Sequence, residues 1–194
     1  MALRVDGLAE WMLSGILHAL REERLARGCT QDVLAGALSV RGPAICAWET
    51  ETNAPSLDHL ILWAAAIDRR LVIVDRRVEL RSDVRQLPGE SWVRSERRRL
   101  ADPLGKRRND RGVTHLTLAT CIGVSRSSVQ RWESAEVPPR PIALIVWAQA
   151  LGCSLGLRVV EGLGEALRPQ DDRRVSTVGA NVRRGVESLP RGGA

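Results

Sequence analysis

Four polar side chains in the later part of the chain have the types and spacing needed to read the edges of base pairs. They lie in the stretch RSSVQRWES, at residues 126–134, and are Arg126, Ser127, Gln130 and Arg131. On a helix that advances about 100° per residue, all four fall within an arc of roughly 140°. The residues on the opposite, packing side are Ser128, Val129 and Trp132. Arginine can donate two hydrogen bonds to guanine O6 and N7, and glutamine can pair with adenine, so this face predicts base recognition in the major groove of double-stranded DNA.

The neighbouring residues predict the elements that hold this face in place. Thr114 is suited to cap a helix over HLTLATCI, Gly123 to end that helix, and Ser125 to cap the next one. Two short helices joined by a tight glycine turn make a helix-turn-helix. Beyond Pro139 an apolar stretch predicts a further helix closed by Gly152, and SLGLRVVEG then predicts a β-strand.

The same pattern occurs twice in the chain. Residues 20–74, the first copy, align without a gap with residues 104–158, the second copy, at an offset of 84 and with 17 identities in 55 positions. Four of the six tryptophans are paired by this offset and are predicted to be core residues: Trp48, Trp63, Trp132 and Trp147. Residues 8–27 predict a long amphipathic helix ahead of the first copy. Its counterpart at 91–111 is expected to start late, because Pro103 and Gly105 interrupt it.

At these residues the sequence resembles the Cro and phage-repressor type of helix-turn-helix, also called the xenobiotic response element family. The loose family pattern is T-Q-x-x-L-A-x-x-x-G-V-S-x-x-x-(I/V)-x-x-W-E followed by a proline. THLTLATCIGVSRSSVQRWE meets it, and TQDVLAGALSVRGPAICAWE meets most of it. The resemblance implies a mainly α fold with two tandem lambda-repressor-like domains, each followed by a short β-strand or hairpin. It also implies that the third helix of a domain enters the major groove.

The expected organisation follows from the repeat and from composition. We expect a first domain at residues 1–81, a linker at 82–95, a second domain at 96–162 and a flexible tail at 163–194. The tail is expected because the chain from about Leu167 is rich in Gly, Arg and Ser and poor in large apolar residues.

The two copies are predicted to share a fold and to differ in task. The groove face of the first copy would hold Gly42, Pro43, Cys46 and Ala47, which include no amide and no cation. The second copy is therefore predicted to be the main DNA reader, with the first serving association or weak backbone contact. The alternative is a pseudo-dimer, in which both third helices enter successive major grooves about 34 Å apart.

Further residues are predicted to contact DNA phosphates. They are Thr114, His115, Ser125, Arg140, Arg107, Arg108, Arg111 and Arg41. The Arg-rich linker has two interpretations: its cations neutralise DNA phosphates, or it is a solvated connector between the two copies. His115 is expected to be a donor at a helix N-terminus, because the sequence places no acidic or thiol partner beside it. Glu49 and Glu133 are expected to pair with arginines.

Composition favours an anionic partner and excludes several classes. The net charge is +6, and it is unevenly spread: −3 over residues 1–75, +7 over 76–162 and +2 beyond. The four cysteines have no metal-ligand spacing, and we expect reduced, mostly buried thiols. The sequence contains no phosphate loop and no nucleophile-base arrangement, so we expect no catalysis, no metal and no cofactor. No segment is long and apolar enough to span a membrane, which favours a cytoplasmic, nucleoid-associated protein.

The predicted partners are double-stranded DNA and a second copy of the chain. Homodimerisation is expected because the apolar strand LVIV, at residues 71–74, offers an edge for pairing. The alternative is that LVIV pairs inside the chain with GLRVV, at residues 156–160. A second protein partner for the first copy is left open. The alternative function is an antitoxin or adaptor-like interaction module, with DNA binding secondary.

Overall fold

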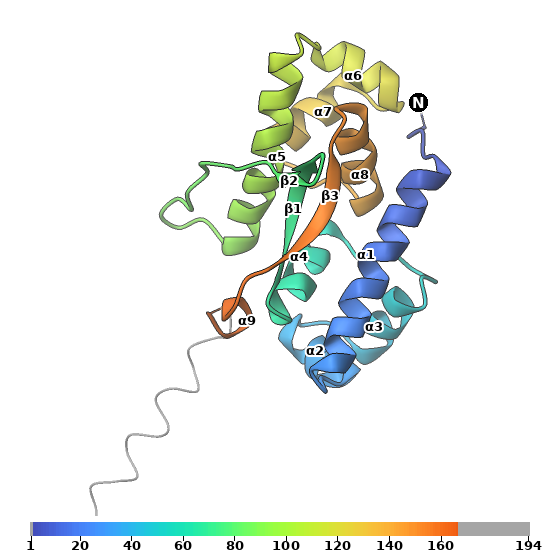
Figure 1. The fold of residues 1–194 in the computed structure, drawn as a ribbon, viewed down its shortest axis with the longest axis vertical. Helices are drawn as coiled ribbons and strands as arrows, with labels where there is room; N and C mark the ends of the chain where they lie inside the picture. The colour runs from blue at the N-terminus through green and yellow to red at the C-terminus, as the bar shows by residue number, and fades with distance from the viewer. Residues whose placement is uncertain (1, 167–194) are drawn as a thin grey trace, which may run out of the picture.

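The computed structural model describes residues 2–166, which form an elongated molecule with a small sheet at its centre (Figure 1). The earlier elements are α1 (Gly7–Ala26), α2 (Gln31–Ala37), α3 (Gly42–Glu49), α4 (Leu57–Ala66), β1 (Arg69–Asp75) and β2 (Val78–Glu79). The later ones are α5 (Trp92–Asp110), α6 (His115–Ile122), α7 (Arg126–Glu133), α8 (Pro141–Ala150), β3 (Ser154–Val159) and the short α9 (Leu163–Ala166). Helices α2 and α6 lie near opposite ends of the long axis.

Four helices and a strand recur in the same order at an offset of 84 residues. We call residues 7–75 the first half and residues 92–159 the second half. The turns recur as well, since Ser39 has a positive φ of 56° where Gly123 has 78°, and Asp68 has 55° where Gly152 has 66°. A non-glycine residue in the left-handed region is uncommon, so these paired turns show that the two halves follow the same backbone path.

The predicted caps are present. Thr114 and Ser125 accept hydrogen bonds from the backbone N–H groups of Thr117 and Ser128, and Thr30 caps α2 in the same way. Each bond satisfies a donor that the first turn of a helix would leave free.

The predicted late start of the helix before the second copy is wrong. Helix α5 runs without a break from Trp92, inside the segment expected to be linker, and continues through Pro103. A proline inside a helix removes a hydrogen bond and crowds the preceding turn. Tertiary packing outweighs that cost here, because Pro103 and Leu104 are buried and a Cβ added at Gly105 would lie 3.7 Å from the Glu133 carboxylate.

The sheet has the order β2-β1-β3, so β1 is its middle strand. Antiparallel pairing places Leu71 opposite Leu157 and Ile73 opposite Leu155. LVIV therefore pairs with β3 of the same chain. This is the alternative to its pairing with a second copy of the chain. On the far side of β1, β2 and the Arg99 guanidinium, which donates to the Leu71 carbonyl, occupy the edge. The prediction of dimerisation through LVIV thus loses its structural basis.

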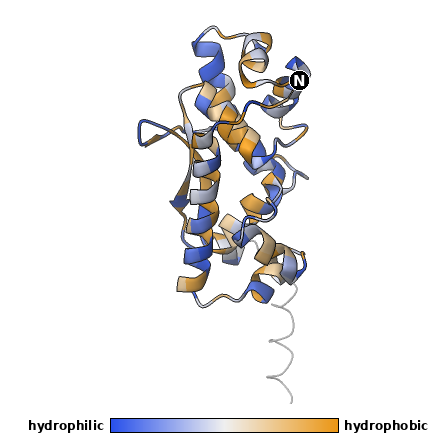
Figure 2. Cartoon of the chain, turned by 90° about the vertical axis from the view of Figure 1, so that its right-hand side faces the viewer, coloured by the Kyte–Doolittle hydropathy of each residue, from blue (hydrophilic) through white to orange (hydrophobic). Residues whose placement is uncertain are grey.

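One hydrophobic core joins the two halves. All four repeat-paired tryptophans are buried, which confirms their prediction as core residues. Trp48 and Trp63 have ring centroids 6.1 Å apart, and Trp132 and Trp147 have centroids 5.9 Å apart with a similar tilt. Figure 2 shows hydrophobic segments in the upper, middle and lower parts of the molecule, so they are not confined to one half.

The first residues of the predicted tail are structured. Residues 163–166 form α9, and the Gly164 N–H donates to the Asp68 carboxylate at 2.9 Å. The rest of the predicted flexible tail, residues 167–194, lies outside the described residues. Within residues 2–166, no helix has the length and apolar character needed to cross a membrane.

Candidate nucleic-acid interface

Helices α6 and α7 form the two arms of a compact helix-turn-helix in the second half. The chain reverses at Gly123, whose left-handed φ of 78° ends α6. Ser125 then caps α7. Leu118 and Ile122 on α6 and Val129 on α7 are buried and fix the two helices against each other.

The outward face of α7 is the one that helix geometry predicted. The side chains of Arg126, Ser127, Gln130 and Arg131 are exposed, whereas Val129 and Trp132 are buried and Ser128 is half-buried. Within residues 2–166, Arg126 and Gln130 make no side-chain hydrogen bond. Arg131 lies 3.4 Å from Glu136, but both side chains are more than half exposed, and such a pair contributes little. The donors of this face are therefore available to a ligand.

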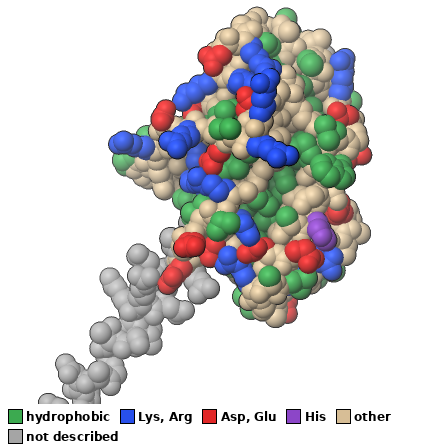
Figure 3. Space-filling model, viewed as in Figure 1, with side chains coloured by type: hydrophobic (Ala, Val, Ile, Leu, Met, Phe, Trp, Pro, Cys, Tyr) green, Lys and Arg blue, Asp and Glu red, His purple; other side chains and the backbone are tan. Residues whose placement is uncertain are grey.

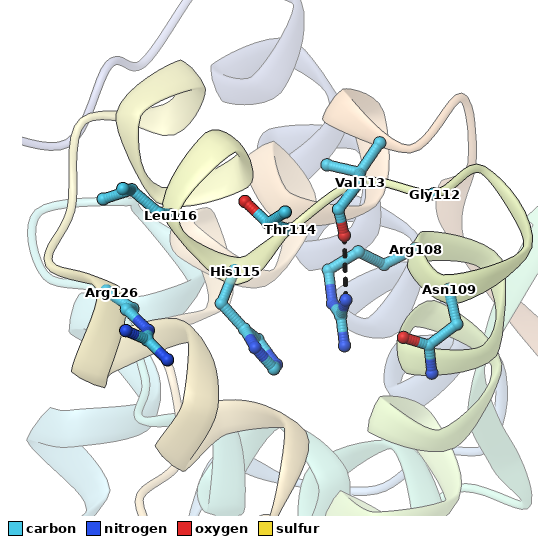
Figure 4. A pocket seen from close by; sticks show the side chains of 8 residues that line it. All are labelled: Arg108, Asn109, Gly112, Val113, Thr114, His115, Leu116 and Arg126. Atoms are coloured by element: carbon cyan, nitrogen blue, oxygen red, sulfur yellow. Dashed lines mark hydrogen bonds between the residues drawn. The ribbon is translucent and has the colours of Figure 1, made fainter.

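A hollow of about 540 Å³ lies beside this face, at the N-terminus of α6 (Figure 4). The side chains of Arg108 and His115 point into it, Thr114 lies along one wall, and Arg126 stands at the rim. The first backbone N–H groups of a helix favour an anion, and Arg126 at the rim adds a cation, whereas Arg108 and His115 are bound to the Glu133 carboxylate.

His115 has an acidic neighbour, contrary to the sequence-based expectation. Its Nε2 lies 2.8 Å from the Glu133 carboxylate, which also receives two hydrogen bonds from Arg108, at 2.6 and 2.9 Å. Burial alone would raise the pKa of Glu133, but the bonds from Arg108 and His115 outweigh burial and lower it below its usual 4.5. The predicted pairing of Glu133 with an arginine is confirmed, as is that of Glu49, which binds Arg24 at 2.6 Å.

Two predicted phosphate contacts hold the fold together instead. Arg108 is buried, and its third hydrogen bond goes to the Val113 carbonyl at 2.8 Å. Arg107 binds the Asp75 carboxylate of the first half at 2.6 Å. Sequence alone could not separate these arginines from solvated ones, because their carboxylate partners, Glu133 and Asp75, lie 25 and 32 residues away along the chain. The identity of Arg24 with Arg108 across the repeat was the one available signal.

The other predicted phosphate contacts lie on the surface. Thr114, Ser125, Arg140, Arg111 and Arg41 are all exposed. The first four belong to the second half, and Arg41 is the residue directly before α3 in the first half, where its side chain makes no capping hydrogen bond.

One cation near the interface was missed. The segment before α1 reaches the turn between α6 and α7, where the Arg4 N–H donates to the Ile122 carbonyl at 2.9 Å and its side chain donates to the Cys121 carbonyl at 3.3 Å. Arg4 is exposed. No local pattern pairs the amino terminus with a turn more than 100 residues away, so only the tertiary structure identifies it.

The equivalent surface of the first half lacks directional donors. Pro43 and Cys46 on α3 are exposed, and Ala47 is half-buried. Asp32 lies close by, because a side chain added at Gly42 would meet its carboxylate at 2.7 Å. Figure 3 shows Lys and Arg side chains grouped mainly in the upper part of the molecule, around α5 and the sheet. The surface of α2 and α3 therefore differs in chemistry from that of α6 and α7, although the two backbones agree.

The expectation of mostly buried thiols is wrong. Cys46 and Cys121 are exposed, Cys29 is half-buried, and only Cys153 among the four is buried. Burial raises the pKa of the Cys153 thiol, which makes it a poor nucleophile.

Comparison with known proteins identifies a helix-turn-helix family match in the second half and none in the first. Residues 104–157 match the helix-turn-helix family of the Cro/C1 type, and no second copy is identified. The matched segment runs from α5 to β3 and contains both arms of the helix-turn-helix and the hollow beside them. No curated protein and no solved structure matches the chain. The match indicates DNA as a partner of this segment.

Proposed function

We propose that the protein is a sequence-specific, double-stranded DNA-binding transcriptional regulator that reads the major groove mainly with α7. The observation that carries this proposal is the exposed row of Arg126, Ser127, Gln130 and Arg131 on the second arm of the matched helix-turn-helix. Bidentate donors at such positions discriminate one base pair from another. This role requires no catalytic group, which agrees with a non-enzymatic regulator.

Phosphate contacts would orient α7 in the groove. Thr114 and Ser125 at the helix N-termini, with Arg111 and Arg140 at the flanks, offer donors on the same half. Arg4 adds a cation at the turn between the two arms. The hollow at the N-terminus of α6 would hold one phosphate between these groups.

We further propose that the first half is a second, divergent helix-turn-helix that has kept the backbone fold and lost the side chains that recognise bases. Its turn at Ser39 and its Arg24–Glu49 pair repeat those of the second half. Its groove face carries Cys46 and Ala47 where the second half has Gln130 and Arg131. Such a face suits association more than base reading.

A protein-interaction role is the second candidate, and one observation favours it. The exposed residues of α2 and α3 include the apolar Val33, which is 62% exposed, together with Pro43 and Cys46, and the acidic Asp32. That chemistry repels phosphate and accepts a protein surface. An adaptor or antitoxin would bind its partner here and use the second half for DNA.

Selection of bound duplexes from random DNA tests the proposal. The whole chain should enrich a defined motif, and the Arg126→Ala, Arg131→Ala double variant should lose it. The control is the Cys46→Ser, Ala47→Ser variant, whose changes lie at the positions equivalent to Gln130 and Arg131 and should leave the motif intact. Enrichment of no motif by the wild-type chain, or equal damage by both variants, would refute the proposal.

A further inference from the structure

The pairing of β1 with β3 is symmetric with respect to the repeat. Val72 lies opposite Gly156, and these two residues occupy the same position in their halves, 84 residues apart. Leu71 lies opposite Leu157, and Ile73 lies opposite Leu155. Because Leu155 is the repeat equivalent of Leu71 and Leu157 that of Ile73, exchanging the two halves converts one pair into the other. A register centred on one equivalent position is the signature of a two-fold contact.

The helices obey the same symmetry. Helix α1 packs on α8 of the other half, and its equivalent α5 packs on α4, the equivalent of α8. Likewise α5 contacts β1, and α1 contacts β3. Each contact from the first half to the second is thus repeated by the equivalent contact from the second half to the first. The two subunits of a symmetric dimer contact each other in the same way.

We infer that one chain contains the two-fold pair that helix-turn-helix readers otherwise assemble from two chains, and that it binds a non-palindromic DNA site as a monomer. This inference rests on the proposed DNA-binding function. Dimeric readers have two equal recognition helices and two equal half-sites. Here only α7 carries base-reading donors, so the site contains a single block of specified bases without an inverted copy.

The interface also disfavours pairing between like halves of two chains. On one side, Arg97 of α5 binds Asp58 of α4 at 2.7 Å. The equivalent positions on the other side are Leu13 and Ile142, both partly buried against the core. Two first halves would place Asp58 against Leu13, and two second halves would place Arg97 against Ile142. Each arrangement leaves a charge without its partner, which is costly.

A second ion pair also favours contact between unlike halves over contact between like halves. Arg70 of β1 binds the buried Glu96 of α5, whereas the equivalent positions hold Ser154 and Met12. Pairing of two second halves would leave Glu96 facing Ser154 without Arg70. Unlike halves are therefore the favoured partners, and a single chain holds one of each.

A disulfide across the two strands tests the pairing without DNA. Arg69 and Val159 are opposite neighbours in the strand register, and both side chains reach the surface in part. In a background with Cys46→Ser and Cys121→Ser, the Arg69→Cys, Val159→Cys double variant should form a cross-link within one chain. It should run as a single chain on a non-reducing gel, and the two single-cysteine variants are the controls. Cross-linked pairs of chains would overturn the inference.

The DNA complex supplies the second readout. Light scattering should give the mass of one chain for the free protein, and of one chain with one duplex for the complex with an enriched sequence. The enriched motif should be one block with no inverted repeat. Two chains on an inverted repeat spaced by about 10 base pairs would overturn the inference while leaving DNA binding intact. If no motif is enriched, the proposed function fails, and the cross-link and the free mass still decide the pairing.

Discussion

The two halves of the molecule share a backbone and a buried ion pair, and they differ on the surface that would face DNA. Arg24 and Glu49 in the first half are matched by Arg108 and Glu133 in the second, at the same 2.6 Å. Arg131 of the second half is matched by Ala47 in the first. The comparison teaches that both halves keep the buried residues that hold the fold, whereas the exposed residues proposed to read bases are present in the second half and replaced in the first.

The largest expected effect is on stability and concerns the shared ion pair. Arg24→Leu and Arg108→Leu should each lower the free energy of unfolding by about 3 to 5 kcal/mol, because each leaves a largely buried carboxylate without its cation. Since one core joins both halves, each variant should still unfold in a single transition, measured by circular dichroism during denaturation. Two separate transitions would show that the halves are independent.

The next effect is on DNA affinity and separates the two groove faces. Arg126→Ala and Arg131→Ala should each weaken binding to an enriched duplex by about 1 to 3 kcal/mol and relax the preference at one position. Cys46→Ser and Ala47→Ser, at the places equivalent to Gln130 and Arg131, should change affinity little. Fluorescence anisotropy at fixed salt measures both sets. Equal losses would mean that both halves read bases.

Acid should weaken the contact between the halves through Glu96. Burial would raise the pKa of this carboxyl, but hydrogen bonds from Arg70 and Arg99 outweigh burial and lower it below its usual 4.5. A group with a lowered folded-state pKa stabilises the fold above its unfolded value, and that contribution is lost as the pH falls below about 4.5. Glu96→Gln should therefore be less stable than the wild type at pH 7, and the difference should shrink below pH 4.5.

A matched control for that titration is Asp110→Asn, at the exposed end of α5. It should leave the pH dependence of unfolding as it is in the wild type. If the Glu96→Gln difference stayed constant from pH 7 to pH 3, the carboxylate would not be the charged partner of Arg70.

The smallest expected effect is at His115. In the first half Gln31 occupies the equivalent position and donates to Glu49 at 2.8 Å, the same distance that joins His115 to Glu133. His115→Gln should thus change the free energy of unfolding by less than about 1 kcal/mol and leave DNA affinity nearly unchanged. A tenfold or greater loss of affinity would assign the imidazole itself a contact with DNA.

Much of the local structure could be predicted from the sequence because its causes are local. The caps at Thr114 and Ser125, the turn at Gly123 and the inward tryptophans follow from residue type and helical period. The outward direction of the α7 side chains followed from the same geometry.

The long-range choices could not be predicted in this way. LVIV has the same alternation whether it pairs with GLRVV or with another chain, and the packing of α5 on α4 and β1 decides between them. Arg107 and Arg108 look like any solvated arginine until Asp75 and Glu133 are placed beside them. Helix α5 passes through Pro103 because its neighbours bury that turn, a cause that lies outside the helix.

Methylation interference on an enriched duplex tests most directly whether α7 alone reads the bases. An arginine that binds guanine in the major groove uses N7, the atom that methylation blocks. With the wild-type chain, interference should appear at guanines in one block, and the signal at individual guanines should disappear in Arg126→Ala or Arg131→Ala. Interference that is unchanged in those two variants and lost in Cys46→Ser or Ala47→Ser would contradict the account.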